Sequence, residues 1–520
     1  MTDDVTFYDD IEGYCGRLSC APGDTVTLHV STRCGRYDAA VHRWGAQREL
    51  VWQSPDLAGS HVPPLPDADA NGCRWPVSVE IPVGDDWRSG FYLVTLTGHE
   101  PDYPTAHAGF VVRAGPQRQR ALLVLATNTW NAYNTWGGKS LYTGGHRVSF
   151  RRPFGRGLLH RPEVDRDDRK ARPTRWGEEP DSNGDRFQEY RTAHGYPAAI
   201  GSTGWFSHER RFVEWAEAAG YAFDVCVSSD LDDDPAVLDG YELLIDVGHD
   251  EYWSAGQRST VEAHVAGGGH FASLSGNTMF WQVRLEGPDD DPGATMVCHK
   301  YTAHETDPVV AAGDTDAMTG MWCDPLVGRP EWALLGAASA WGLYSRFGQA
   351  TPRGSGAFTV YRADHWLLAG TGLRYGDLLG ARDGVVGYET VGCRIDFDDL
   401  QLPVARPADG LPTDIEIVAF TPSSNLAVGE YPASISALSD QGDLEFLAVR
   451  LYGGHDEDSL ARVRHGNAVL SVCRPHGDTG GEVVVAGTTD WVFGLARDPM
   501  VAQVTANILD RYLATPDPPS

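Results

Sequence analysis

The sequence predicts an α/β protein: an open, largely parallel sheet flanked by helices, with a β-rich insertion and a preceding β-sandwich. Continuous apolar runs such as "ALLVLAT" (121–127) and "LLIDV" (243–247) are typical of strands buried in a parallel sheet. Amphipathic helical segments alternate with these runs, and strand–helix alternation indicates an open α/β sheet. Short segments before residue 115 alternate apolar and polar residues instead, which indicates an antiparallel β region.

The first predicted domain spans residues 1–115. Its segments "DTVTLHVST", "GFYLVTLTG" and "HAGFVVRA" are separated by turns rich in Pro, Gly and Asp. This spacing, without a helical period, is typical of a small antiparallel sandwich. We therefore expect an immunoglobulin-like β-sandwich with a structural or interfacial role.

The second predicted domain spans residues 116–515. After the first strand, "RRFVEWAEAAGY" predicts an amphipathic helix that ends at Gly220, and "AFDVCV" predicts the next strand. "SAGQRSTVEAHVAGGG" predicts a helix with Ser254 as its N-cap, and "HFASLSG" predicts the strand after it. "EVVVAGTTDW" and "DPMVAQVTANILDRYL" predict a last strand and helix that return to the same sheet.

Two stretches of the second domain do not fit this alternation. Residues 285–420 contain many short β-like pieces, and we expect a β-rich insertion there. Residues 143–204 are rich in Arg, Asp, Gly and Pro without periodicity, and a long irregular stretch in a compact domain is usually a lid or binding loop. We interpret it as a cover for the active site.

Composition limits the partners and the compartment. The 520 residues carry a formal net charge of −30, which argues against a nucleic acid or an anionic membrane as the main partner. The acidic N-terminus lacks the pattern of a signal peptide, and no apolar stretch is long enough for a transmembrane helix. The nine cysteines are scattered without a CxxC pair, so we expect reduced thiols in a cytoplasmic protein.

Polar side chains follow three of the predicted strands, where an open α/β sheet binds its ligands. Asn128 to Tyr142 follow the first strand, His249 to Glu251 follow "LLIDV", and Ser275 to Asn277 follow "HFASL". Backbone alternation sends His249 and Glu251 to one side, where they can bind a metal or act as a base with its partner. The alternative is that Glu251 caps the next helix and His249 bonds a neighbouring loop.

The helix at 254–269 with its flanking strands resembles class I glutamine amidotransferase-like folds, particularly the ThuA-like group. Amidotransferases carry a nucleophilic cysteine on a sharp turn between strand and helix. No cysteine stands at the corresponding turns here, and Cys226 lies inside a strand-like run. We therefore do not expect a thiol mechanism.

A more specific resemblance rests on several segments in order: "ATNTWNAYNTWGGKSLY", "VGHDEYWS", "SGNTMFWQVR" and "RYGDLLGARDGVVGYE". They are similar to segments of the large (beta) subunit of N,N-dimethylformamidase and its relatives, from about residue 14 to about residue 505. The resemblance implies an amidohydrolase that splits small N-substituted formamides into formate and an amine. It also implies one iron ion held by two tyrosines and one glutamate, and a small second subunit; we expect a homo-oligomer.

The resemblance also implies roles for individual residues. Glu251 matches the iron-binding glutamate, His249 the catalytic histidine, Asn277 an asparagine near the metal, and Glu389 in "VVGYET" a second catalytic acid. Tyr133 in "NAYNTW" matches the first tyrosine ligand.

For the second tyrosine ligand that the resemblance implies, we expect Tyr190 in "FQEYRTAHGY", with Tyr142 and Tyr196 as alternatives.

The chemistry agrees with this assignment. An amide carbonyl is a poor electrophile, and a cation can polarise it and activate water. Phenolate and carboxylate are hard oxygen donors that suit a hard cation such as Fe³⁺. His249 can take a proton from water, Glu389 can give one to the departing amine, and Asn277 can hold an oxyanion. Aromatic residues can wall the site for a small N-substituent, namely Trp130, Trp136, Phe280 and Trp281.

One alternative belongs to a different functional class. A β-sandwich joined to a ThuA-like domain can also serve as a non-catalytic carbohydrate- or protein-binding protein. The presence of His249, Glu251 and Glu389 together favours the enzyme.

Overall fold

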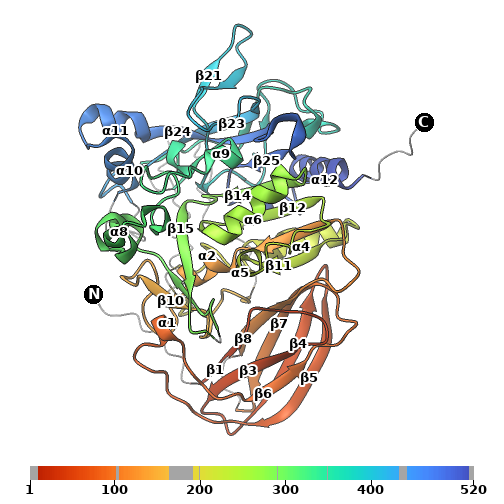
Figure 1. The fold of residues 1–520 in the computed structure, drawn as a ribbon. Coiled ribbons are helices and arrows are strands. Elements are labelled where there is room, and N and C mark those ends of the chain that lie inside the picture. Colours follow the sequence, from red (N-terminus) through yellow and green to blue (C-terminus); the bar gives the residue numbers. More distant parts are fainter. Residues whose placement is uncertain are drawn as a thin grey trace.

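The computed structural model describes residues 10–100, 105–162, 191, 193–197, 199–289, 291–347, 350–431 and 442–514. Strands dominate this part of the chain and lie in several sheets, with few long helices. In Figure 1 the N-terminal strands lie at the bottom, the largest sheet crosses the middle, and a hairpin projects at the top.

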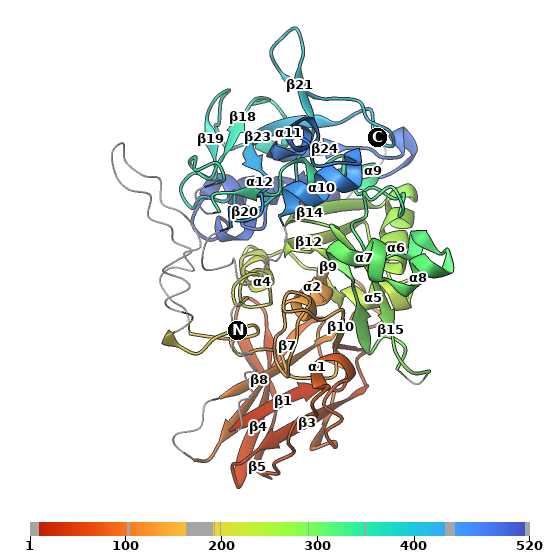
Figure 2. The same ribbon diagram turned by 90° about the vertical axis from the view of Figure 1, so that its left-hand side faces the viewer.

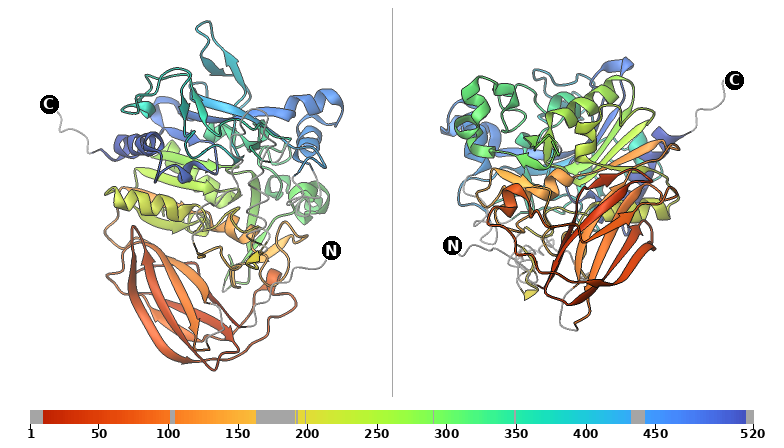
Figure 3. Two further views of the ribbon diagram at one scale, coloured as in Figure 1. Left: turned by 180° about the vertical axis from the view of Figure 1, so that it is seen from behind. Right: turned by 60° about the horizontal axis from the view of Figure 1, so that its bottom comes forward.

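The N-terminal strands form a three-stranded sheet of order β1-β3-β6 and a five-stranded sheet of order β2-β8-β7-β4-β5. Both sheets contribute to one hydrophobic cluster that includes Val26, Leu28, Val41 and Val94. The right-hand view of Figure 3 shows these strands from below. The elements are β1 Ile11–Cys15, β2 Ser19–Cys20, β3 Thr25–Thr32, β4 Arg36–Trp44, β5 Arg48–Ala58, α1 Ala68–Asn71, β6 Val79–Pro82, β7 Gly90–Gly98 and β8 Ala106–Val112.

The largest sheet begins as a parallel sheet, as the apolar runs predict. Its first strands are β11 Asp224–Val227, β9 Ala121–Leu125, β12 Leu243–His249, β14 His270–Gly276 and β25 Val483–Ala486, in that spatial order. Each neighbouring pair is parallel. The strand near the C-terminus therefore returns to the sheet, and β12 runs two residues beyond the predicted end to include His249.

Helices cover both faces of these parallel strands. Because successive side chains of a strand point to opposite faces, neighbouring strand residues pack against different helices. Leu123 and Ile245 pack in one cluster with residues of α4 (Glu209–Ala218) and α12 (Pro499–Leu513). Leu122 and Leu244 pack in a second cluster with residues of α5 (Ser228–Asp233) and α6 (Ala255–Ala266). Seen from behind, α4 and α12 lie in front of the sheet (left view of Figure 3).

Beyond β25 the same sheet continues with antiparallel strands. These are β24 His465–Cys473, β23 Glu416–Ser424, β17 Tyr344–Ser345 and β20 Tyr388–Glu389. Four short strands attach to the side of this path: β18 Phe358–Val360, β19 Leu378–Leu379, β21 Ile395–Phe397 and β22 Pro403–Ala405. Most of the short strands after residue 340 thus extend the central sheet, as Figure 2 shows from the side.

A smaller four-stranded sheet lies beside the ends of the parallel strands. Its order is β10-β16-β15-β13, with β10 Arg147–Ser149, β16 Thr295–Val297, β15 Trp281–Glu286 and β13 Tyr252–Ser254. Through β10, part of the irregular region after residue 143 joins a sheet. The remaining helices are α2 Thr127–Ala132, α7 Ala303–Thr306, α8 Pro308–Ala312, α9 Trp332–Leu335, α10 Asp443–Tyr452 and α11 Glu457–Arg464.

All nine cysteines are buried and unpaired, as the scattered spacing predicts. Within the described residues, every helix is too short or too polar to cross a membrane. The division into domains at residue 115 and the immunoglobulin-like and amidotransferase-like classes stay predictions.

Candidate active site

The candidate site lies where β9, β12 and β14 end. His249 is the last residue of β12, Glu251 stands two residues later, and α2 with Tyr133 at its end follows β9. Glu389 arrives from the antiparallel part of the sheet, on β20. All four side chains are buried, and His249 and Glu251 expose 1% and 2% of their surface.

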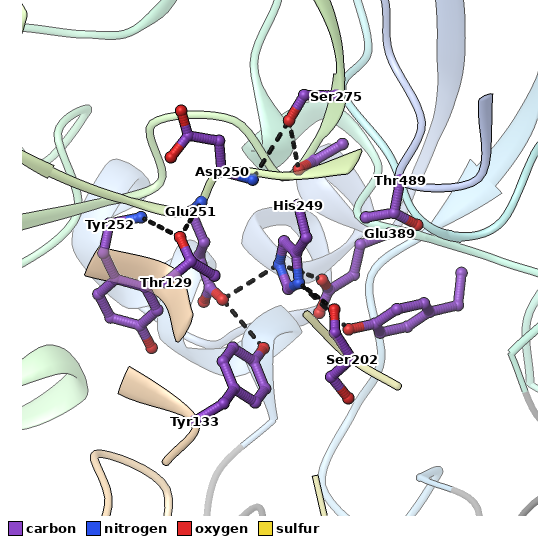
Figure 4. Close-up of polar contacts among 12 residues, drawn as sticks. Thr129, Tyr133, Ser202, His249, Asp250, Glu251, Tyr252, Ser275, Glu389 and Thr489 are labelled. Carbon is purple, nitrogen blue, oxygen red and sulfur yellow. Dashed lines mark hydrogen bonds and ion pairs between the residues drawn. The ribbon is translucent and has the colours of Figure 1, made fainter. Parts of the chain in front are cut away.

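The His249 imidazole lies between two carboxylates (Figure 4). Its Nε2 is 2.7 Å from Glu389 Oε2 and 3.2 Å from Glu251 Oε2. Its Nδ1 is 2.8 Å from the backbone carbonyl oxygen of Ser202. A carbonyl oxygen only accepts hydrogen bonds, so Nδ1 carries the proton of this bond and Nε2 faces the two carboxylates.

Three donors from separate parts of the chain hold the Glu251 carboxylate. Tyr133 Oη donates to Glu251 Oε2 at 2.9 Å. Tyr142 Oη lies 2.9 Å from both carboxylate oxygens. Trp281 Nε1, on β15, donates to Oε1 at 2.8 Å. A buried carboxylate is stable only with such partners, and these donors also fix its orientation.

The two phenols also contact each other. Tyr142 Oη is 2.7 Å from Tyr133 Oη and 2.9 Å from Tyr252 Oη. The Lys300 ammonium lies 3.4 Å from the centre of the Tyr142 ring, a cation–π distance. Phenolic oxygens, a carboxylate and a cation therefore share one buried volume.

Burial and neighbouring charges shift the acids and bases of this group. Burial alone lowers the pKa of His249, but the charges of Glu389 and Tyr388 and the contact with Glu251 raise it well above the ordinary value. Burial raises the pKa of Glu389, and contact with His249 only partly offsets this. For Glu251 burial is outweighed by His249, Lys300 and Tyr142, so its pKa is lowered.

The pKa of both phenols lies well above the ordinary value. Burial is the main cause for Tyr133 and for Tyr142, and the charge of Glu251 adds to it. Burial likewise lowers the pKa of the Lys300 ammonium. Deprotonated phenols in this site therefore need a strong compensating positive charge, which a metal ion provides.

Two overlapping donor sets can hold a cation here. Oxygens bound to one cation at about 2.0 Å and at right angles lie about 2.8 Å apart. Tyr133 Oη, Tyr142 Oη and the Glu251 carboxylate, at mutual distances of 2.7 to 2.9 Å, fit that spacing. His249, Glu251 and Glu389 form the second set, with ligand atoms all within 4.8 Å of one another.

The remaining predicted ligands and wall residues fall in different places. Tyr190 lies outside the described residues, and Tyr196 packs at the edge of the cluster around α4. Of the predicted walls, Trp281 reaches Glu251, whereas Trp136 packs against Trp75 near the N-terminal sheets. Trp130 donates its indole N–H to Glu209.

Asn277 lies directly after Gly276, which pairs with His249 across the parallel ladder. Its side chain is buried, and its backbone adopts the left-handed conformation at φ 51°, which asparagine tolerates. Its Oδ1 is buried without a hydrogen-bond partner among the described residues.

Several neighbours of the site were not predicted from the sequence. Ser202 contributes only a backbone carbonyl, for which the side-chain pattern carries no signal. Lys300 and Tyr388 contribute a cation and a ring beside the predicted residues. For Tyr388 the sequence did carry a signal, because this residue directly precedes the predicted acid Glu389.

The comparisons with known proteins agree with the resemblance. Residues 36–505 match the family model described as N,N-dimethylformamidase beta subunit-like, C-terminal, and the chain belongs to this family. A search of curated proteins finds no match. The family supports an amidohydrolase-type function, and it does not favour the non-catalytic binding protein.

Proposed function

We propose that this chain, as a member of the N,N-dimethylformamidase beta subunit-like family, is an iron-dependent amidohydrolase. Its substrate is a small N-substituted formamide or a related amide, which it cleaves at the C–N bond to give a carboxylic acid and an amine. The supporting observation is the convergence of two phenols and Glu251 beside the His249–Glu389 pair.

We assign the cation to Tyr133, Tyr142 and Glu251. These three side chains offer hard oxygen donors at the separations that a hard cation needs. Tyr142 takes the place for which Tyr190 was the first prediction, because its oxygen touches both Tyr133 and Glu251. When bound, the cation supplies Lewis-acid polarisation of the amide carbonyl.

We assign proton transfer to His249 and Glu389. Their Nε2 and Oε2 atoms lie 2.7 Å apart and can share one proton. With the shared proton on Glu389, His249 is neutral and takes up the proton of the attacking water at Nε2, with its ring held in place by the Ser202 carbonyl. Glu389 delivers a proton to the departing amine nitrogen, and its raised pKa favours the protonated form that this step requires.

Asn277 is assigned to the developing oxyanion. Its buried side chain lies one residue after the strand end that pairs with His249, and its left-handed backbone turns the chain there. A side-chain amide N–H is a suitable donor for an oxyanion in a buried site. Because the surrounding side chains are almost fully buried, we expect acceptance of small N-substituents only.

Release of formate from N-alkylformamides tests this assignment. We expect turnover by the wild-type chain and a loss on the order of 10²–10⁴ in rate for His249→Ala and for Glu389→Gln, with metal retained. Glu331→Gln is the matched control, because Glu331 is also a fully buried glutamate. Normal turnover in both site variants would remove the catalytic roles, and metal loss in His249→Ala would make His249 a ligand.

A further assignment concerns the assembly. We propose a homo-oligomer, and a small second subunit of the kind the resemblance implies stays a prediction. The mass of the purified chain in solution tests the homo-oligomer. The same measurement after co-expression with a candidate small subunit tests the second subunit.

A further inference from the structure

The loop after β25 carries two buried threonines, Thr488 and Thr489. The Thr488 hydroxyl lies 2.9 Å from the carbonyl oxygen of Val385 and 3.0 Å from that of Gly387, to which it can donate. The same hydroxyl accepts hydrogen bonds from the backbone N–H groups of Gly387 and Asp490, each at 3.2 Å. One side chain thus makes four contacts, most of them to the segment that leads into Glu389.

Thr489 continues this support toward the candidate acid. Its backbone N–H donates to the carbonyl oxygen of Glu389 at 3.1 Å, and its hydroxyl donates to that of Gly387 at 2.9 Å. The strand that carries Glu389, β20, has only two residues and pairs with β17 alone among the named strands. The two threonines therefore supply the second side of its hydrogen bonding.

Gly276 leaves the space in which this contact forms. A Cβ on Gly276 would lie 2.3 Å from the Glu389 carbonyl oxygen and 2.3 Å from the Thr489 nitrogen. Both are backbone atoms that cannot rotate away. The end of β14, which aligns with His249, therefore packs directly on the bond between Thr489 and Glu389.

We infer that Thr488 and Thr489 are positioning residues for Glu389. They hold the backbone of residues 387–389 against β14, so that the Glu389 carboxyl stays within 2.7 Å of His249 Nε2. This inference rests on the proposed role of Glu389. Neither threonine forms a hydrogen bond to His249, Glu251 or the two phenols, whereas both bond the segment that carries Glu389.

The test is Thr488→Val, which keeps the shape of the side chain and removes the hydroxyl. We expect kcat to fall about 10- to 100-fold, because a displacement of about 1 Å in a catalytic group can cost on the order of 10²-fold. KM should stay within about twofold and the metal content should not change. Thr488→Ser keeps the hydroxyl and should restore kcat.

The matched control is Thr32→Val in the N-terminal sheets. Thr32 is buried, and its hydroxyl also bonds one backbone carbonyl, of Asp10, and one backbone N–H, of Cys34. It should leave kcat unchanged. If Thr488→Val does not fold, Thr489→Val removes a smaller part of the support and should lower kcat about two- to tenfold, the worth of one neutral hydrogen bond.

A double-variant cycle separates this inference from the proposed function. In the Glu389→Gln background, Thr488→Val should cause no further loss of kcat, because groups that act as one unit cannot be lost twice. An equal additional loss in that background, or normal kcat in Thr488→Val alone, would overturn the inference while leaving the proposed function intact. Normal turnover in Glu389→Gln would instead overturn the role of the glutamate, and the inference with it.

Discussion

Replacing Trp281 by Phe removes one donor from Glu251 and keeps an aromatic ring in the same place. Trp281 is 1% exposed, and its indole N–H is 2.8 Å from Glu251 Oε1. A hydrogen bond to a charged group contributes about 1.5–3 kcal/mol. We take the low end of this range, about 1.5 kcal/mol, as the loss.

Such a loss predicts roughly tenfold weaker metal binding, since about 1.4 kcal/mol corresponds to a factor of ten. The effect agrees in size with the replacement of groups that orient metal ligands in other proteins, which typically costs 10- to 100-fold. Competition for iron against a chelator of known affinity measures the dissociation constant directly.

Trp322→Phe is the control, because Trp322 is equally buried and packs in the cluster with α6. The Trp322→Phe variant also loses a buried indole, but one that makes no hydrogen bond to Glu251. The reasoning would be refuted by an unchanged dissociation constant in Trp281→Phe, or by an equal loss in both variants.

Two predictions concern stability. Burial raises the pKa of Glu482, but bonds from Arg511, Arg474 and Tyr512 outweigh this and lower it to about 2. Because folding lowers this pKa, the ionised carboxylate stabilises the fold at pH values above the ordinary carboxyl pKa, and this stabilisation is lost as the pH falls. Glu482→Gln should therefore lower the unfolding free energy by about 3 kcal/mol at pH 7 and by little near pH 2. Urea unfolding over this range checks it, and a pH-independent difference would contradict it. The Ser254 hydroxyl accepts the N–H of Gln257 at 3.0 Å as the predicted N-cap of α6, so Ser254→Ala should lower the unfolding free energy by about 1 kcal/mol; an unchanged urea midpoint would contradict this.

The part of the site at the parallel strand ends was predictable from the sequence. Continuous apolar runs marked β9, β12 and β14, and parallel strands bring their carboxyl ends to one edge. Side-chain alternation then placed His249 and Glu251 on one side, and their atoms lie 3.2 Å apart. This reasoning needs only local pattern and topology.

Glu389 could not be placed in this way. It is 140 positions after His249 and arrives on a two-residue strand of the antiparallel extension. The short β-like pieces around it predicted an insertion, because local pattern does not tell which sheet a strand joins. Only the family resemblance pointed to this residue.

The choice among Tyr142, Tyr190 and Tyr196 was also beyond the sequence. The region after residue 143 lacks periodicity, so nothing in it orients one phenol relative to another. In the structure the hydroxyl of Tyr142 touches Tyr133 and Glu251. The contribution of Trp281 was hidden for another reason, since a buried tryptophan is usually core and its N–H partner depends on packing.

The central claim is that Tyr133, Tyr142 and Glu251 hold iron, and the iron content with the visible spectrum of the purified chain tests it most directly. We predict a single iron per chain and a tyrosinate-to-iron absorption band that is lost or strongly reduced in Tyr142→Phe and retained in Tyr196→Phe. Colourless wild-type protein without iron would contradict the claim. So would a Tyr142→Phe variant with full iron and an unchanged band, and loss of the band in Tyr190→Phe instead would move the second ligand to that tyrosine.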